Sequence, residues 1–130
     1  MNDLERFLDL PDVSNIEEEI FVSKRIGKVK IKAMSTEAFS EYQRAAGMNK
    51  VSKKGVGGDI TKLNIEMVAG QVVEPNFANK EFLDKVKCTT ATEFVAKKLL
   101  VGEVTEIARQ IQRISGFDVD INEEIEEAKN

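Results

Sequence analysis

The chain has 130 residues and a net charge of −4, with no histidine, no tryptophan and one cysteine. Because it has no histidine, the chain lacks the commonest general base and the commonest transition-metal ligand. A single thiol can form neither an internal disulfide nor a thiolate zinc cluster. We therefore expect no enzyme activity, no metal and no cofactor. No apolar run approaches the roughly 20 residues of a membrane span, and the first ten residues do not resemble a signal peptide, so we expect one cytoplasmic domain over residues 1–130 that binds no membrane.

The N-terminal residues 1–18 are predicted to form a flexible acidic arm. Leu4, Phe7 and Leu8 fall on one side of a short amphipathic turn, and an acidic connector follows Pro11. Chain ends of this kind are often mobile until something ties them down. A partner-binding arm is the alternative interpretation.

A β-hairpin is predicted at about residues 20–34. Val29, Ile31 and Ala33 alternate with lysines, which is typical of a half-buried strand, and Gly27-Lys28 suits a two-residue turn. With that turn, Ile26 would face Val29 across the hairpin. One face would then be apolar.

The other face of this hairpin is predicted to be basic. Its cations are Arg25, Lys28, Lys30 and Lys32. Like charges directly opposite each other are mildly unfavourable in a sheet, so this face would gain from an acidic neighbour. The sequence leaves two candidates for that neighbour, the chain's own C-terminal tail and another chain.

A compact bundle of about five to six helices is predicted after the hairpin, which makes the fold class α+β and mainly α. Four residues that favour the N-cap position precede segments of helical periodicity: Ser35, Asp59, Asn79 and Thr90. The apolar residues expected to point inward from these helices are Phe39, Tyr42, Ala45, Ala46, Ile60, Leu63, Met67, Val68, Phe82, Leu83, Val86, Phe94, Val95 and Leu99.

Residues 47–58, GMNKVSKKGVGG, are predicted to form a mobile loop rich in lysine and glycine. A phosphate-binding loop would require the pattern Gly-x-x-x-x-Gly-Lys-Ser/Thr between a strand and a helix, and this segment lacks it. A surface loop is therefore the preferred interpretation.

The clearest helix signal is an apolar stripe that ends at Gly116. The stripe repeats at i, i+3, i+4, i+7 and i+10 and consists of Val104, Ile107, Ala108, Ile111 and Ile114. Gly116 suits the left-handed residue that ends a helix, and Gly102 is the expected joint with the preceding helix. An acidic helix is predicted over residues 118–130.

Charge is distributed unevenly along the chain. The net charges are −6 for residues 1–20, +7 for 21–62, 0 for 63–117 and −5 for 118–130. Because acidic ends match the basic block, we favour screening by the termini, or simple solvation, over nucleic-acid binding. The candidate partner-binding residues are the basic hairpin face (Arg25, Lys28, Lys30, Lys32) and any part of Ile107, Ile111 and Ile114 that the core leaves exposed.

Several strings in this order resemble the XkdN-like tail assembly chaperones of tailed phages and prophages of Gram-positive bacteria. They are IKAMSTEAFSEYQ at 31–43, VVEPNF at 72–77, LLVGEVTEIARQI at 99–111, SGFD at 115–118 and the closing EEAKN. Where relatives often have a proline before the Gly-Glu pair, this chain has Val101. The resemblance covers the chain from about Ile20 to the C-terminus.

This resemblance implies a non-catalytic assembly factor of the bacterial host cytoplasm that is absent from the finished virion. Its partners would be the tape measure protein and the major tail tube protein. Two alternatives stay open. One is a structural tail or neck subunit, and the other is a nucleic-acid-binding regulator that uses residues 21–62. The sequence does not give the oligomeric state.

Overall fold

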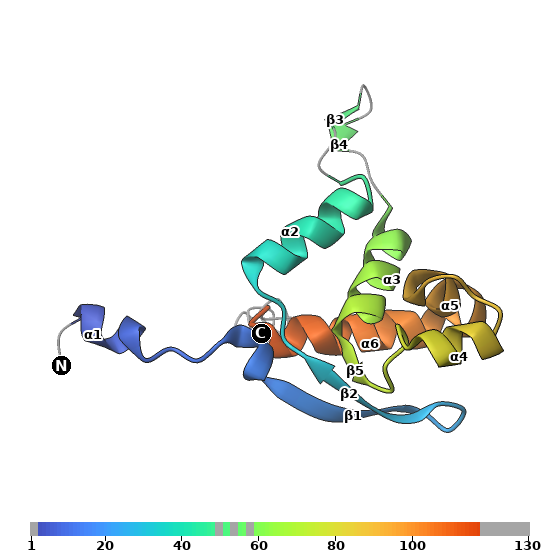
Figure 1. The fold of residues 1–130 in the computed structure, drawn as a ribbon. Helices are drawn as coiled ribbons and strands as arrows, with labels where there is room; N and C mark the ends of the chain where they lie inside the picture. The colour runs from blue at the N-terminus through green and yellow to red at the C-terminus, as the bar shows by residue number, and fades with distance from the viewer. Residues whose placement is uncertain (1–2, 49–50, 53–54, 57–58, 118–130) are drawn as a thin grey trace, which may run out of the picture.

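The computed structural model describes residues 3–48, 51–52, 55–56 and 59–117. Within these ranges the fold is α+β and mainly α, as the sequence predicts, with a hairpin followed by five helices (Figure 1). The elements are α1 (Asp3–Leu8), a 3-10 turn (Val13–Asn15), β1 (Glu17–Ser23), β2 (Gly27–Lys32), α2 (Thr36–Ala45), β3 (Val51–Ser52), β4 (Gly55–Val56), α3 (Ile60–Gln71), β5 (Val72–Glu74), α4 (Lys80–Lys85), α5 (Ala91–Lys98) and α6 (Val101–Ile114).

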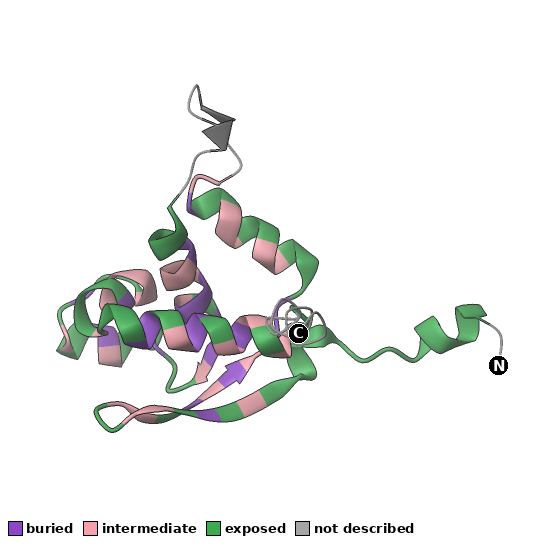
Figure 2. Ribbon diagram, turned by 180° about the vertical axis from the view of Figure 1, so that it is seen from behind, coloured by how far each residue is buried: buried purple, intermediate pink, exposed green. Residues whose placement is uncertain are grey.

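A three-stranded antiparallel sheet, ordered β1-β2-β5, packs one face against α6. Helix α3 packs on α6, and α2 and α5 pack on α3. Buried positions concentrate on α3, α6 and the inner face of β2 (Figure 2). The largest fully buried side chains include Ile31 of the sheet, Met67 of α3 and Ile107 of α6, so the core lies where these three elements meet.

The hairpin is confirmed, but its predicted register is wrong. Val29 pairs with Ile20 and not with Ile26, and β1 begins at Glu17 inside the expected arm. The turn spans residues 24–26, and Gly27 follows it with φ +82°. A three-residue loop closed by a left-handed glycine is a common hairpin connection, because that glycine makes the bulge that restores pairing.

Pairing between acids and bases explains the observed register. The shift places Glu17 opposite Lys32 and Glu19 opposite Lys30. The predicted register would instead have placed Arg25 opposite Lys30 and Ser23 opposite Lys32. Opposite charges that face each other stabilise a sheet, so the hairpin's own first strand supplies acidic neighbours to the basic face.

Strand β5 was not predicted from the sequence. It continues directly from α3 and pairs with β2, with Val72 opposite Ile31 and Glu74 opposite Lys30. A three-residue strand is too short to show a period of two. Its effect is to bring the segment after it, which includes Phe77, beside the hairpin.

All four predicted N-caps are confirmed, and each side chain accepts a hydrogen bond from the backbone N–H three residues later. At α5, the Glu93 carboxylate also accepts a hydrogen bond from the backbone N–H of Thr89 (2.9 Å). The residues expected to point inward are buried or half-buried, except Ala45 and Ile60, which are exposed. These two lie at the end of α2 and the start of α3, so they project beyond the core.

The joint between α5 and α6 lies at Leu99 and Leu100 and not at Gly102. Helix α5 ends at Lys98, and both linking residues have extended backbones, with ψ near 146° and 151°. Gly102 is the second residue of α6. The break comes earlier because the Glu103 carboxylate accepts the Leu100 N–H at 2.7 Å, which caps α6 there.

The predicted loop and C-terminal helix lie wholly or partly outside the described residues. Within 47–58, the structure describes the first two residues and a short ribbon of β3 and β4, in which Val51 pairs with Val56. Residues 118–130 are outside the description. Among the described helices, none combines the length and hydropathy that crossing a bilayer requires.

Candidate functional site

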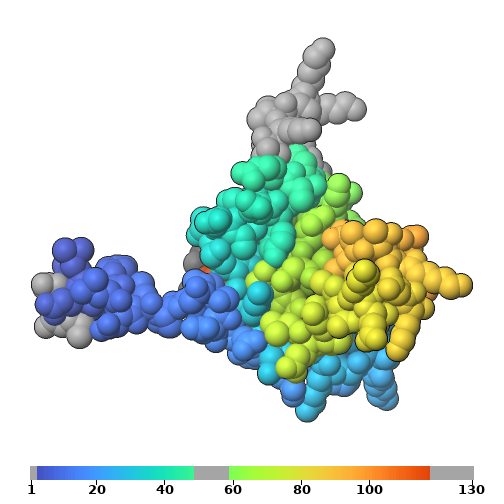
Figure 3. All heavy atoms as spheres, viewed as in Figure 1, coloured from blue at the N-terminus to red at the C-terminus, as the bar shows by residue number. Residues whose placement is uncertain are grey.

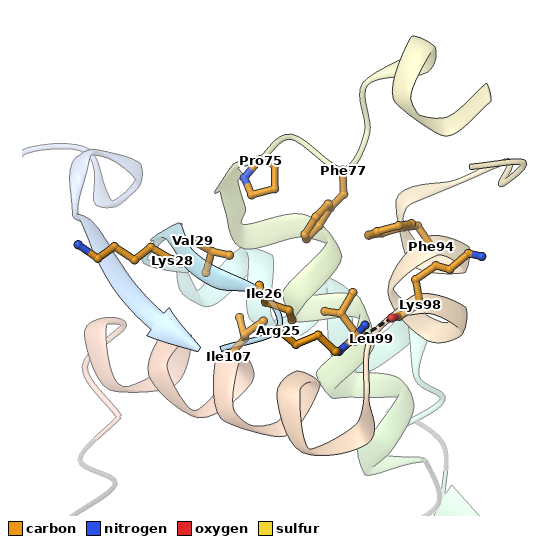
Figure 4. A pocket seen from close by; sticks show the side chains of 10 residues that line it. All are labelled: Arg25, Ile26, Lys28, Val29, Pro75, Phe77, Phe94, Lys98, Leu99 and Ile107. Atoms are coloured by element: carbon orange, nitrogen blue, oxygen red, sulfur yellow. Dashed lines mark hydrogen bonds between the residues drawn. The ribbon is translucent and has the colours of Figure 1, made fainter. Parts of the chain in front are cut away.

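An apolar pocket of about 290 Å³ opens between the hairpin tip and α5 (Figure 4). Its lining comes from four separate parts of the chain: Arg25, Ile26, Lys28 and Val29 from the hairpin, Pro75 and Phe77 from the segment after β5, Phe94, Lys98 and Leu99 from α5 and its end, and Ile107 from α6. Sites for drug-sized ligands occupy roughly 300–1,000 Å³. The volume therefore suits two or three apolar side chains of a partner better than a large cofactor.

Aromatic side chains form one wall of this pocket. Phe77 and Phe94 lie with ring centroids 5.1 Å apart, and both rings face the cavity (Figure 4). Phe82 of α4 supports them from outside the pocket, with its ring centroid 4.8 Å from that of Phe94 in an edge-on arrangement. Aromatic groups held in this way give a rigid apolar surface for a partner side chain.

The Arg25 guanidinium joins the hairpin tip to the start of α6. Its Nη2 donates to Glu103 Oε1 (2.5 Å) and its Nε to Glu103 Oε2 (3.0 Å), which makes the pair bidentate. The same Nη2 donates to the carbonyl oxygen of Lys98 (3.0 Å), shown by the dashed line in Figure 4. Arg25 thus connects the two sides of the pocket.

Glu103 is a buried acid with a full set of donors. Besides Arg25, it accepts the hydroxyl of Ser23 (3.1 Å) and the N–H of Leu100 (2.7 Å). The pKa of Glu103 is lowered to about 2, and the hydrogen bonds from Arg25 are the largest cause of this shift. Burial acts in the opposite direction. The carboxylate therefore stays ionised at neutral pH and keeps the hairpin tip fixed.

The pocket opening carries positive charge. Lys28 and Lys98 line it with their aliphatic stems, and their ammonium groups extend away on opposite sides (Figure 4). Lys28 lies 3.6 Å from Glu19, whereas Lys98 makes no ion pair with any residue in the described part of the chain. No acid is among the lining residues. An apolar ligand with acidic flanks would therefore complement this pocket.

The predicted basic hairpin face is divided by the structure. Arg25 and Lys28 reach the pocket, while Lys30 and Lys32 lie on the outer face of the sheet. Lys30 is 3.7 Å from Glu74 of β5. Arg25, Lys28 and Lys30 each have an acidic partner, so most of the charge on this face is paired.

The core occupies most of the predicted apolar stripe. Ile107 and Ile111 are both buried, and Ile107 lies at the floor of the pocket, where it borders the cavity. Ile114 is half-buried and lines a different groove, next to Ile16 and Met34. Ile114 is therefore the one of the three candidates that keeps surface for a partner.

Phe77 and Lys98 were not predicted as site residues. A signal existed for Phe77, because three of the seven phenylalanines of the chain fall within residues 77–94. For Lys98, no signal existed, since its position depends on where α5 ends and on how far the hairpin reaches.

Two further features of the described residues concern metal ligands and the single cysteine. Among them, no group of three or more carboxylate or thiol side chains is arranged to hold a metal ion. Cys88 is buried, and its thiol donates to the carbonyl oxygen of Val86 (3.7 Å), as expected of a packed structural cysteine.

Two comparisons with known proteins gave a match. Residues 4–129 match the family model described as "Phage XkdN-like tail assembly chaperone protein". The crystal structure of the protein YqbN, a structural genomics target, superposes with a TM-score of 0.68 and 21% sequence identity, covering 91% of this chain and 99% of that one. At this identity the likeness shows the fold alone. No curated protein sequence is a significant match.

Proposed function

This chain belongs to the family of XkdN-like phage tail assembly chaperones, and from that premise we propose that it binds the tape measure protein while the tail is assembled. The binding takes place in the bacterial host cytoplasm, and the chain is not retained in the finished virion. Tail tube subunits then displace it. Its role is one of binding and shielding, without a chemical step.

The observation that carries this proposal is the apolar pocket with basic flanks. A long amphipathic helix presents apolar side chains at i, i+3 and i+4, and a hydrophobic groove recognises such a stripe. Phe77, Phe94 and Leu99 supply the apolar contact surface, while Lys28 and Lys98 favour a helix whose flanks are acidic. The pocket is small, so each contact is weak and reversible, which suits a factor that must be displaced.

Co-expression with the tape measure protein from the same phage or prophage tests the proposal. We expect the tape measure protein to be recovered in the soluble fraction only with this chain, and the two to elute together in size-exclusion chromatography with light scattering. Lys98→Glu should reduce recovery of the complex, because it reverses a charge at the pocket while leaving the core intact. Lys62→Glu, an exposed reversal on α3, is the matched control.

A structural tail or neck subunit is the second candidate, and the exposed apolar residues of α1 favour it, since a permanent assembly would cover them. An insoluble tape measure protein, together with elution of this chain as a stable ring, would replace the chaperone proposal with this one.

A further inference from the structure

The arm segment, residues 3–10, exposes large apolar side chains that no described part of the chain covers. Leu4 is 78% exposed, Phe7 66%, Leu8 79% and Leu10 64%, and α1 has no buried residue. Apolar side chains that are exposed singly are common, but a contiguous group of this kind marks an interaction site. The exposed apolar residues of the arm segment therefore indicate that it binds a partner surface.

The pattern of the arm segment defines the surface that it fits. Leu4, Phe7 and Leu8 stand at i, i+3 and i+4, so they form one stripe along α1. Around this stripe the segment carries three acids, Asp3, Glu5 and Asp9, against one base. It is a short helix with an apolar stripe and acidic flanks.

The pocket has the complementary character. Its wall and floor are apolar, its flanks carry Lys28 and Lys98, and no acid is among its lining residues. Lys98 has no acidic partner in the described part of its own chain. An acidic flank of the arm segment would provide that partner, while Phe7 and one of the leucines enter the cavity.

The position of the arm segment favours docking on another copy of the chain rather than on its own body. The arm leaves the molecule at the base of β1, whereas the pocket lies by the turn at the other end of the hairpin (Figure 1). In Figure 3 the arm segment projects clear of the body, on the side away from α4 and α5. Each molecule therefore presents the arm and the pocket in opposite directions.

We propose that the arm segment of one copy docks in the pocket of a second copy. The contact joins two different surfaces, so each molecule both donates an arm and accepts one. Reciprocal exchange closes a dimer, and one-way exchange gives a chain or ring. This inference concerns the purified protein and holds whether or not the tape measure protein is the partner.

Sedimentation velocity on the full-length chain over a range of concentrations tests the proposal. Wild type should self-associate reversibly, and the double variant Leu4→Ser, Phe7→Ser should weaken association by about tenfold or more, as loss of an anchor does. The double variant Lys28→Glu, Lys98→Glu should also weaken self-association, because it reverses the charges that flank the pocket. Ile60→Ser and Lys62→Glu are the controls, since both positions are exposed and outside the pocket.

Mixing the two defective chains distinguishes docking between copies from docking within one. The arm variant keeps an intact pocket and the pocket variant keeps an intact arm, so an equimolar mixture should restore heterodimers although neither chain associates alone. Adding Glu5→Lys and Asp9→Lys to the pocket variant should also restore its association, because the charges are exchanged.

Three results would overturn the proposal. A wild-type chain that stays monomeric at every concentration would remove it, and so would association that the arm and pocket variants leave unchanged. A mixture in which no heterodimer forms would show that the arm segment docks within its own chain or elsewhere. Circular dichroism of each variant shows that the fold is retained, which the exposure of the substituted residues leads us to expect.

Discussion

Arg25 and Glu103 connect the hairpin turn to the first turn of α6 through two parallel hydrogen bonds of 3.0 and 2.5 Å. The two residues are 78 positions apart in the sequence. Because Glu103 also caps α6 through the Leu100 N–H, one carboxylate determines both the start of a helix and the position of the hairpin tip.

Glu103→Ala should therefore destabilise the protein by about 1.5–3 kcal/mol, the range typical of hydrogen bonds to a charged group. Urea denaturation measures the loss. Glu106→Ala is the matched control, because that carboxylate is at the surface of the same helix and pairs with Arg109 three residues away, so its removal should cost less than about 1 kcal/mol. Equal losses of unfolding free energy in the two variants would show that the buried position of Glu103 adds nothing to its contribution to stability.

The same carboxylate should make stability depend on pH. The pKa of Glu103 is about 2 in the folded protein against 4.5 for an ordinary glutamate, so its contribution is complete above pH 4.5 and is lost as the pH falls through about 2. The difference in unfolding free energy between wild type and Glu103→Gln should therefore shrink between about pH 5 and pH 2. Glu81→Gln, an exposed change in α4, serves as the reference. A difference that stays constant over this window would rule out the assigned pKa.

Two glycine substitutions in helices should have opposite effects. A Cβ on Gly70 would fall on the Tyr42 hydroxyl and lie 2.7 Å from its Cζ, whereas one on Gly102 would meet nothing within 4 Å. Tyr42 cannot move freely, because its hydroxyl donates to Gln71 Oε1 at 2.5 Å. Gly102→Ala should stabilise the protein by about 0.5–1 kcal/mol through helix propensity, and Gly70→Ala should destabilise it by about 1–2 kcal/mol.

Thermal unfolding of the two variants compares them directly. For a chain of this size, 1 kcal/mol corresponds to a few degrees, roughly 2–5 °C in Tm. A rise in Tm for Gly70→Ala would mean that Tyr42 leaves its position at no cost, and the contact with Gln71 would then be unimportant for stability.

Proline should be tolerated at Val101 but not one residue earlier. Val101 is the first residue of α6 and is exposed, and Leu100 before it has φ −71° and ψ 151°, which is the conformation that a following proline prefers. Val101→Pro should stabilise the protein by about 0.4–1 kcal/mol, because it restricts the unfolded chain.

Leu100→Pro is the control for this prediction, because it removes the N–H that donates to Glu103. It should destabilise the protein by at least about 1 kcal/mol. Urea denaturation measures the unfolding free energy of both variants. Changes of the same sign in the two variants would contradict the boundary between α5 and α6 described above.

Local interactions were predictable from the sequence and distant ones were not. The N-caps Ser35, Asp59, Asn79 and Thr90 were found because each bonds to a backbone group three residues away. The hairpin register was missed because the same alternating residues fit two pairings, and the choice depends on which acids face the lysines. Periodicity alone carries no information about such charge pairs.

The candidate pocket was only partly predictable for the same reason. Arg25 and Lys28 were singled out as charged hairpin residues, but their predicted partner was a tail or another chain. The bidentate contact with Glu103, and the approach of Phe77 through β5, join segments that are far apart in the sequence. A single sequence gives no measure of such long-range proximity.

The order in which the pocket residues occur along the chain sets a sequence of events during synthesis. Arg25 is translated long before the floor residue Ile107, so a growing chain has no complete pocket until synthesis has passed Ile107. The arm segment, by contrast, is translated before every residue that lines the pocket, since synthesis proceeds from the N-terminus. A nascent arm therefore meets complete pockets only on molecules that were finished before it.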